Sequence, residues 1–272
     1  MSKKSNPQQM SFLDHLEELR WHLIRATIAV LIAGLVAFMC KGIVFDGLLF
    51  GPKRTEFPTY RFFCWLSGVL GLDRSFCLDE LPFIIQSRTM AGQFSAHIWT
   101  SITAGFIVAF PYVLYEFWKF IAPALLSNEK KSARGFLFFS SLLFFLGVLF
   151  GYYVITPLSI NFLGSYQVSD QVLNEFDLSS YISLVRASVL ACGLVFELPI
   201  VIYFLAKIGL VTAEGLRQYR KISLVIVLIL SAVITPPDVA SQIIVSIPII
   251  ILYEISILIA KAVAKNLEKE AF

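Results

Sequence analysis

Residues 136–155 read FLFFSSLLFFLGVLFGYYVI, twenty residues without a single charge. As an α-helix this stretch rises about 30 Å, which matches the hydrocarbon core of a lipid bilayer. The rest of the 272-residue chain has the same character: 57% of its residues are hydrophobic and only 15% are charged, whereas soluble domains carry about 25% charged residues. A soluble enzyme, a secreted disulfide scaffold and a disordered protein are all disfavoured, and the composition indicates an integral membrane protein.

Six such apolar stretches divide the chain, because a charge at mid-bilayer costs roughly 3 kcal/mol and so marks the end of a span. They cover residues 23–45, 97–120, 136–155, 183–206, 222–235 and 241–260. The last two are short, since only 16 uncharged residues separate Lys221 from Asp238, and a helix of that length reaches about 24 Å. The sequence predicts an all-α integral membrane protein with one six-span domain (1–272), whose short final hairpin either thins the bilayer or simply tilts.

Basic residues predict the orientation of these spans. With the N-terminus inside, fifteen of the 22 Lys and Arg residues lie on the inner side, as the positive-inside rule requires. Six of the other seven lie in or beside a long outer loop (46–96), where the rule is weakest. Both termini, including a tail at 261–272, are therefore predicted to be cytoplasmic. Phe12, Leu16 and Leu19 follow a helical period, which predicts an amphipathic helix in segment 1–22 that lies at the cytoplasmic interface.

Glu197 is the clearest anomaly, because it lies inside the fourth span within the segment CGLVFELP at 192–199. An intramembrane carboxylate is costly and is by default a functional hypothesis. The structural alternative is a protonated Glu that bonds to a neighbouring helix. Pro199 lacks a backbone donor, so we expect a kink near Glu197.

Four other carboxylates give weaker signals. Glu18 and Glu129 would face the same membrane surface, although solvated surface ion pairs explain their spacing equally well. Glu116 and Glu254 lie near the cytoplasmic ends of the second and sixth spans, and we expect them to reach the lipid headgroups as anchors.

Cysteine and histidine residues define no reactive site. Cys64 and Cys77 lie in the outer loop, where an oxidising compartment would permit a disulfide, but two free or buried thiols fit the sequence as well. His15 and Glu18 have a spacing of three but no further ligands, so no metal site is predicted. The sequence contains no P-loop, nucleophile elbow or HExxH motif, and its net charge of +3 gives no reason to expect nucleic acid. We therefore predict no catalytic site and no cofactor.

Several strings together resemble the TatC family, the multispanning signal-peptide receptor subunit of the twin-arginine protein translocase. They are HLEELR at 15–20, FIAPAL at 120–125 with Glu129-Lys130, FELP at 196–199, TPPD at 235–238 with Ser241-Gln242, and Pro248 with Tyr253-Glu254. These strings follow the family's order, and the six-span topology with both ends inside agrees. The resemblance implies a cup-shaped bundle in the cytoplasmic (inner) membrane that is not an enzyme.

The same resemblance implies a binding site at the cytoplasmic face. In the family, the positions that match Glu18 and Glu129 read the paired arginines of a folded substrate's signal peptide. A guanidinium offers a planar fork to a carboxylate, and Lys matches that geometry poorly. Arg20, Phe120 and Pro123 match positions that shape the same surface. The implied function is to bind these peptides and to recruit partners for export, driven by the proton gradient.

The resemblance also implies partner contacts within the membrane. Glu197 matches an intramembrane Glu on the concave face of the bundle. Thr235, Asp238 and Gln242 are similar to positions where single-span TatA- and TatB-type partners dock, and Pro52 loosely matches an important proline of the outer loop. Contact with the lipid bilayer and a homo-oligomer within the receptor complex are implied as well.

Two departures from the family and two rival functions remain. The outer loop is longer than usual, and Glu116 stands where Gln is common, as an extra signal-peptide contact or a changed anchor. The main rival is a proton-coupled small-molecule transporter that uses Glu197 as its relay. The transporter hypothesis predicts an internal repeat and discontinuous helices around Glu197, and the sequence shows no convincing repeat.

A lipid-modifying enzyme is a weaker rival, because no acid–base or nucleophile cluster is visible.

Overall fold

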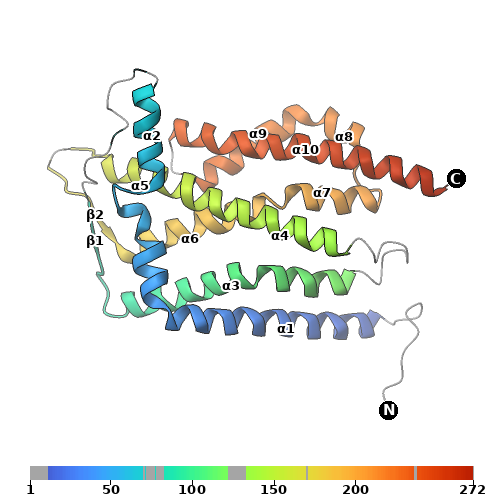
Figure 1. Ribbon diagram of the computed structural model, residues 1–272, viewed down its shortest axis with the longest axis horizontal. Helices are drawn as coiled ribbons and strands as arrows, with labels where there is room; N and C mark the ends of the chain where they lie inside the picture. Colours follow the sequence, from blue (N-terminus) through green and yellow to red (C-terminus); the bar gives the residue numbers. More distant parts are fainter. Residues whose placement is uncertain are drawn as a thin grey trace, which may run out of the picture. The chain divides into compact units, whose positions relative to one another are not determined.

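The chain folds into two compact units. The computed structural model describes residues 12–69, 71, 77, 83–121, 133–169, 171–235 and 238–271. Unit 1 comprises Met1–Val44 and Phe94–Leu142, and unit 2 comprises Phe45–Gln93 and Leu143–Phe272. Both are built mainly from helices (Figure 1).

Unit 1 is dominated by two long helices, α1 (Phe12–Met39) and α3 (Gly92–Ile121), which run side by side in Figure 1. The start of α4 (Ala133–Phe150) completes it. Neither long helix is amphipathic in the manner of a soluble protein. Within Leu16–Met39, only 11% of the most apolar 18-residue stretch is buried inside the protein, so most of its side chains are available to lipid.

The backbones of α1 and α3 touch at a pair of glycines. A Cβ atom on Gly105 would lie 2.6 Å from the Cα of Gly34, so position 105 has no room for a side chain unless the backbone shifts. Small residues permit such close approach between membrane helices. Along the same crossing the Phe38 ring stacks on His97, with ring centroids 3.8 Å apart. The order of these contacts shows that the two helices run antiparallel.

Unit 2 holds the remaining elements, the first of which begins at its boundary with unit 1. In chain order they are the π-helical η2 (Gly42–Leu49), the 3₁₀ turn η3 (Gly51–Lys53), α2 (Pro58–Val69), β1 (Ile84–Gln86), the end of α4, the π-helical η7 (Gly151–Ile155), α5 (Thr156–Ser165), β2 (Glu175–Asp177), α6 (Leu178–Val195), α7 (Leu198–Lys207), α8 (Ala213–Gln218), α9 (Arg220–Ile234) and α10 (Val239–Ala271).

The core of unit 2 forms where α4 and η7 cross α6. Gly147 and Gly151 are four residues apart, and a Cβ at Gly151 would lie 2.7 Å from the carbonyl oxygen of Ser188. This is the small-xxx-small pattern that lets membrane helices pack backbone to backbone. Beside it a buried apolar cluster joins α6, α9 and α10 to η7; its members are Ile155, Cys192, Val227, Val245 and Ile249.

The strands β1 and β2 are the exception to the all-helical prediction. They pair in parallel, with Ile84 opposite Glu175 and Gln86 opposite Asp177. The pair joins the loop before α3 to the loop before α6, and Asp177 then becomes the N-cap of α6. Three-residue strands leave too little alternation for a sequence pattern to reveal them.

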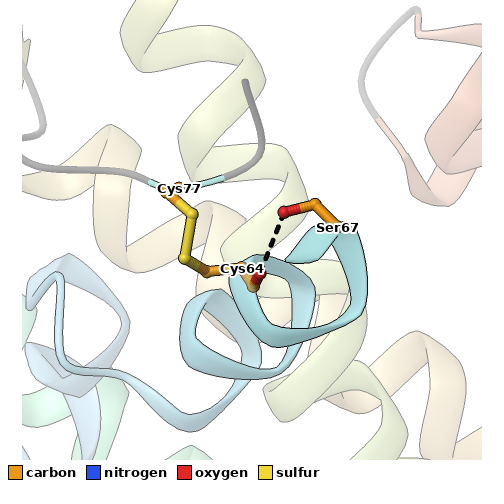
Figure 2. The surroundings of a disulfide bond; sticks show 3 residues. All are labelled: Cys64, Ser67 and Cys77. Atoms are coloured by element: carbon orange, nitrogen blue, oxygen red, sulfur yellow. Dashed lines mark hydrogen bonds between the residues drawn. A yellow bond between two sulfur atoms is a disulfide. The ribbon is translucent and has the colours of Figure 1, made fainter. Parts of the chain in front are cut away.

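The sequence did not decide between a Cys64–Cys77 disulfide and two free thiols, and the structure contains the disulfide. Cys64, on α2, is bonded to Cys77, and their Cα atoms lie 4.5 Å apart (Figure 2). The Ser67 hydroxyl donates to the Cys64 carbonyl oxygen at 2.9 Å. Cys40 and Cys192 are free thiols.

All six predicted spans lie in helical structure, which agrees with a helical membrane protein. Among the described residues, five helical stretches are long and apolar enough to cross a membrane. The fifth predicted span forms α9, which has only 15 residues and is not among these five. The count of six spans and the interpretation as one domain therefore stay predictions.

Two helix boundaries differ from those expected. Residues 12–22 do not form a separate interfacial helix, because α1 continues without a break from Phe12 to Met39; no Pro or Gly stands near residue 22 to end it. The last helix is not short either, since α10 has 33 residues. Charges such as Lys261 end a membrane span, but Lys, Glu and Ala are good helix formers and so the helix continues.

Candidate functional site

The site begins on α1, where Glu18 and His22 are four residues apart and therefore lie on the same face. His22 Nδ1 lies 2.6 Å from Oε2 of Glu116, which belongs to the last turns of α3. Both side chains are buried. This contact fixes the start of α1 to the end of α3 inside unit 1.

Glu116 is surrounded by cations. Arg25 Nη1 lies 3.8 Å from its Oε2, and Lys119 Nζ lies 3.8 Å from its Oε1. Lys119 also sits over the ring of Tyr115, 4.1 Å from the ring centroid. A buried carboxylate requires such pairing, because an unpaired charge loses its hydration without compensation.

The expected headgroup anchor at Glu116 is therefore wrong, because its side chain is only 3% exposed and reaches His22 instead. The antiparallel arrangement of α1 and α3 places the histidine there. Glu254, by contrast, is 46% exposed and pairs with Arg220 at 2.6 Å, as an anchor would.

The surroundings of Glu18 differ from those of Glu116. Glu18 is half-buried, and among the described residues it forms no ion pair or hydrogen bond. The guanidinium of Arg20 lies over the Trp21 ring, 5.5 Å from its centroid. Phe120 lies edge-on to His22 with ring centroids 6.4 Å apart. Pro123 and Glu129 lie outside the described residues, so the structure places three of the five residues predicted for this surface.

Sequence reasoning missed the His22–Glu116 pair. The histidines looked scattered along the chain, since 94 residues separate His22 from its partner. A usable signal did exist: consecutive spans are antiparallel, so the start of the first span and the end of the second must lie at the same membrane surface.

Glu197 occupies the break between α6 and α7. It is buried, and its carbonyl oxygen accepts hydrogen bonds from Ile200 at 2.9 Å and Val201 at 3.0 Å. Pro199 is the second residue of α7, and the interruption lies where its ring predicted a kink. Glu197 itself keeps a right-handed helical conformation, with φ of −73°.

The three residues predicted for partner docking bond within the α9–α10 hairpin. The Thr235 hydroxyl donates to the Ser231 carbonyl at 2.8 Å, and Gln242 Nε2 donates to the Leu228 carbonyl at 3.0 Å. Asp238 caps α10, because its Oδ2 accepts from the backbone amide of Ser241 at 2.9 Å. Their polar groups therefore hold the turn and the two helices together.

Pro52 is buried in η3. The Tyr60 hydroxyl lies 3.0 Å from the Pro52 carbonyl oxygen and 3.1 Å from that of Pro157. Burial raises the pKa of Tyr60, so this hydroxyl remains a proton donor. Among the residues that the structure describes, no group of three His, Cys, Asp or Glu side chains is arranged to hold a metal.

Comparison with known proteins identifies the family. A sequence model of the Sec-independent protein translocase protein (TatC) matches residues 14–248. The TatC protein of Blattabacterium sp. subsp. Periplaneta americana (strain BPLAN) is 45% identical over 264 residues, which cover 97% of this chain and 99% of the relative. That of Aquifex aeolicus (strain VF5) is 36% identical over 258 residues, which cover 94% and 97%.

A crystal structure of the twin arginine translocase receptor TatC has the same fold. It is 35% identical, has a TM-score of 0.68, and the match covers 92% of this chain and 99% of that one. These findings confirm the resemblance seen in the sequence, together with the prediction of a multi-pass membrane protein that is a translocase component and not an enzyme. The chain belongs to the TatC family of twin-arginine protein translocase components.

Proposed function

We propose that this chain is the receptor subunit that binds twin-arginine signal peptides. Glu18 and Glu129 would accept the paired arginines, while Arg20, Phe120 and Pro123 would shape the surface around them. The observation that carries the proposal is the contrast between two carboxylates in unit 1. Glu116 is buried and contacts His22, Arg25 and Lys119, whereas Glu18 has no ion-pair partner among the described residues.

The chemistry favours arginine at Glu18. A half-buried carboxylate without a cationic partner gains from a guanidinium, because charge-assisted hydrogen bonds contribute about 1.5–3 kcal/mol each. The His22–Glu116 contact holds the helix face that carries Glu18, so the carboxylate would be positioned before the peptide arrives. A lysine ammonium would form one point contact in place of a bidentate fork.

The proposed surface is cytoplasmic, in the inner membrane. The distribution of Lys and Arg puts both termini on the cytoplasmic side. The Cys64–Cys77 disulfide supports an oxidising compartment for the segment between α1 and α3. An N-terminal and a Cys77-proximal reporter should therefore be accessible from opposite sides of the membrane.

We place partner docking on the α9–α10 hairpin and at Glu197. Thr235, Asp238 and Gln242 would shape this surface through the turn that they hold. On α9 the apolar side chains of Val225, Ile229 and Val233 repeat every four residues and are exposed, which suits a single-span partner of TatA or TatB type. Buried Glu197 would bond a polar group of such a partner or of an inserted signal peptide. Several copies of the chain would assemble in the complex.

Binding of synthetic signal peptides to the purified chain tests the receptor proposal. Arg-Arg peptides should bind more tightly than Lys-Lys peptides, and Glu18→Ala should weaken Arg-Arg binding roughly 10- to 150-fold, the equivalent of one charge-assisted bond. Glu129→Ala should act in the same direction.

Glu17→Ala is the matched control, because Glu17 is an exposed carboxylate on the preceding position of α1. A general loss of negative charge would weaken binding equally in Glu17→Ala and Glu18→Ala. Equal effects, or unchanged affinity in both Glu18→Ala and Glu129→Ala, would reject the assigned site.

The transporter alternative gains one observation, the helix interruption at Glu197. The interruption is only two residues long, and both keep right-handed helical angles, unlike the unwound segments that coordinate ions in transporters. Family membership supports the translocase. Solute uptake that needs Glu197 but survives loss of Glu18 and Glu129 would favour the transporter.

A further inference from the structure

Unit 2 contains a cavity that none of the roles above uses. Its volume is about 400 Å³, and it lies between α5, the first turns of α6 and the paired strands β1 and β2, elements that are neighbours in Figure 1. The walls come from α5 and α6, and Phe83 and Phe176 line the cavity beside the strands.

The cavity is lined almost entirely by carbon. Seven of its nine lining residues are apolar or aromatic, and the other two are Ser180 and Ser183. The hydroxyl of Tyr181 is turned to the Leu49 carbonyl, to which it donates at 2.9 Å. Water gains little in such a space, because an ordered water needs two to four polar partners. The site therefore suits a hydrocarbon ligand.

Its aromatic end is held rigidly. The rings of Phe83 and Phe176 meet edge to face with centroids 5.1 Å apart. Phe83 also packs on Gly164 of α5, where an added Cβ would lie 2.7 Å from the ring. These contacts keep the cavity from closing by rotation of Phe83.

Charged groups lie just beyond that end. Asp177 accepts a hydrogen bond from the Ser179 amide at 2.8 Å, and Arg88 pairs with the Glu175 carboxylate at 3.6 Å. Lys53 Nζ lies 5.8 Å from the centroid of the Phe83 ring that lines the cavity. From Ser180 to Ala187 the apolar wall extends about 10 Å along α6. Charged groups beside one end of an apolar cavity match the chemistry of a phospholipid, in which a charged headgroup is joined to acyl chains.

The cavity also opens on a surface of α5 and α6 that would contact lipid. Its walls α5 and α6 belong to two of the stretches able to cross a membrane, Gly135–Ser165 and Leu178–Lys207. Leu163, Ser183 and Ala187 line the cavity and are exposed. A mouth formed by exposed residues of membrane-spanning helices faces acyl chains rather than dissolved metabolites.

We propose that this cavity binds one acyl chain of a phospholipid with an anionic headgroup, whose phosphate lies near Lys53. Charge complementarity selects the headgroup: Arg88 already faces Glu175, whereas Lys53 forms no ion pair within the described part of the chain. The inference depends on the membrane location of α5 and α6 and not on signal-peptide binding.

Photocrosslinking tests the occupant. The full chain is placed in phosphatidylcholine nanodiscs that contain phosphatidylglycerol with a diazirine in one acyl chain. After photolysis, label should concentrate in peptides from 156–165 and 178–187, and unlabelled phosphatidylglycerol should compete it away. Label spread evenly over exposed residues of α1, α6 and α9, without competition, would overturn the site in the unmodified protein.

Two matched pairs of variants locate the ligand. Ala187→Phe fills the cavity and should reduce labelling at least about fivefold, whereas Ala232→Phe on α9, which is exposed and does not line the cavity, should not. Lys53→Gln should remove most of the preference for phosphatidylglycerol over labelled phosphatidylcholine, and Lys41→Gln, the same substitution at an exposed lysine that does not contact Phe83, should not.

Unchanged labelling in Ala187→Phe would refute the cavity as the binding site, and an unchanged preference in Lys53→Gln would refute the headgroup contact. Labelling of the same peptides by a diazirine in the apolar segment of a twin-arginine peptide, with none from lipid, would replace the proposed occupant by substrate.

Discussion

Two contacts between a glutamate and a basic side chain have the same length and very different surroundings. His22–Glu116 and Arg220–Glu254 both measure 2.6 Å. The first is buried, with side chains 11% and 3% exposed, while the second is half exposed, at 51% and 46%. Burial decides which of them matters for stability, because water screens and competes for the exposed pair.

Removal of Glu116 should therefore be costly. Glu116→Ala leaves His22 buried without its partner, and we expect the free energy of unfolding to fall by about 1–3 kcal/mol. Glu116→Gln keeps a hydrogen-bond acceptor for His22 and should cost less. Unfolding of the purified protein in detergent micelles measures both, and Glu254→Ala is the control, expected to cost at most about 1 kcal/mol. Equal losses at Glu116 and Glu254 would contradict the assignment of a buried pair.

At the scale of helices, close crossings depend on residues without side chains. Gly105 of α3 faces Gly34 of α1, and a Cβ there would meet backbone atoms, which cannot rotate away. Gly135 of α4 is the opposite case, since nothing lies within 4 Å of the corresponding Cβ position.

Gly105→Ala should destabilise unit 1 by about 1–3 kcal/mol, because the two helices must separate to admit the methyl group. Gly135→Ala should be neutral or stabilising by about 0.5–1 kcal/mol, because alanine loses less backbone entropy in a helix. Thermal unfolding of the two variants in the same detergent gives the comparison. A Gly105→Ala protein as stable as the parent would mean that α1 and α3 do not touch there.

The N-cap of α6 gives a pH dependence. Hydrogen bonds from the Ser179 hydroxyl and amide, with a smaller contribution from Arg88, lower the pKa of Asp177 in the folded protein. A lowered folded-state pKa stabilises the fold above the unfolded value, about 3.9, and this contribution is lost as the pH falls through the folded value. The parent should therefore be more stable than Asp177→Asn at pH 7, and the difference should shrink progressively below about pH 4. Melting temperatures measured from pH 7 to pH 3 test this, and a constant difference would exclude the carboxylate as its source.

For the molecule as a whole, the Cys64–Cys77 disulfide predicts how many of the cysteines react as free thiols. Protein denatured without reductant should show two reactive thiols, Cys40 and Cys192, out of four cysteines, and four after reduction. The bridge closes a loop with a sequence separation of 13, so its loss should cost about 3 kcal/mol in the chain-entropy model. Cys64→Ser/Cys77→Ser and reduced parent should melt at the same lowered temperature. Four reactive thiols before reduction would show that no bridge forms.

The membrane class and the positions of the helices could be predicted from the sequence because charges such as Lys221 and Asp238 mark the ends of apolar stretches. The ends of the helices could not be predicted in this way. A charge ends a membrane span but does not end a helix, and α10 therefore continues past the charges that follow its span. The break at Glu197 was predictable from Pro199 alone. The pairs His22–Glu116 and β1–β2 join positions about 90 residues apart, and no local pattern encodes such contacts.

The shortness of α9 has a mechanical consequence. As the predicted fifth span, its 15 residues would rise about 22 Å, less than the roughly 30 Å of the hydrocarbon core, so the lipids beside it would have to compress or bend. Such a local thinning of the bilayer would store elastic energy around α9. If a second helix with an equally short apolar stretch diffused next to α9, the two thinned regions of the bilayer would merge and part of that energy would be released. We therefore expect the membrane itself to favour the approach of short helices to α9 over that of longer ones, before any side chain makes contact.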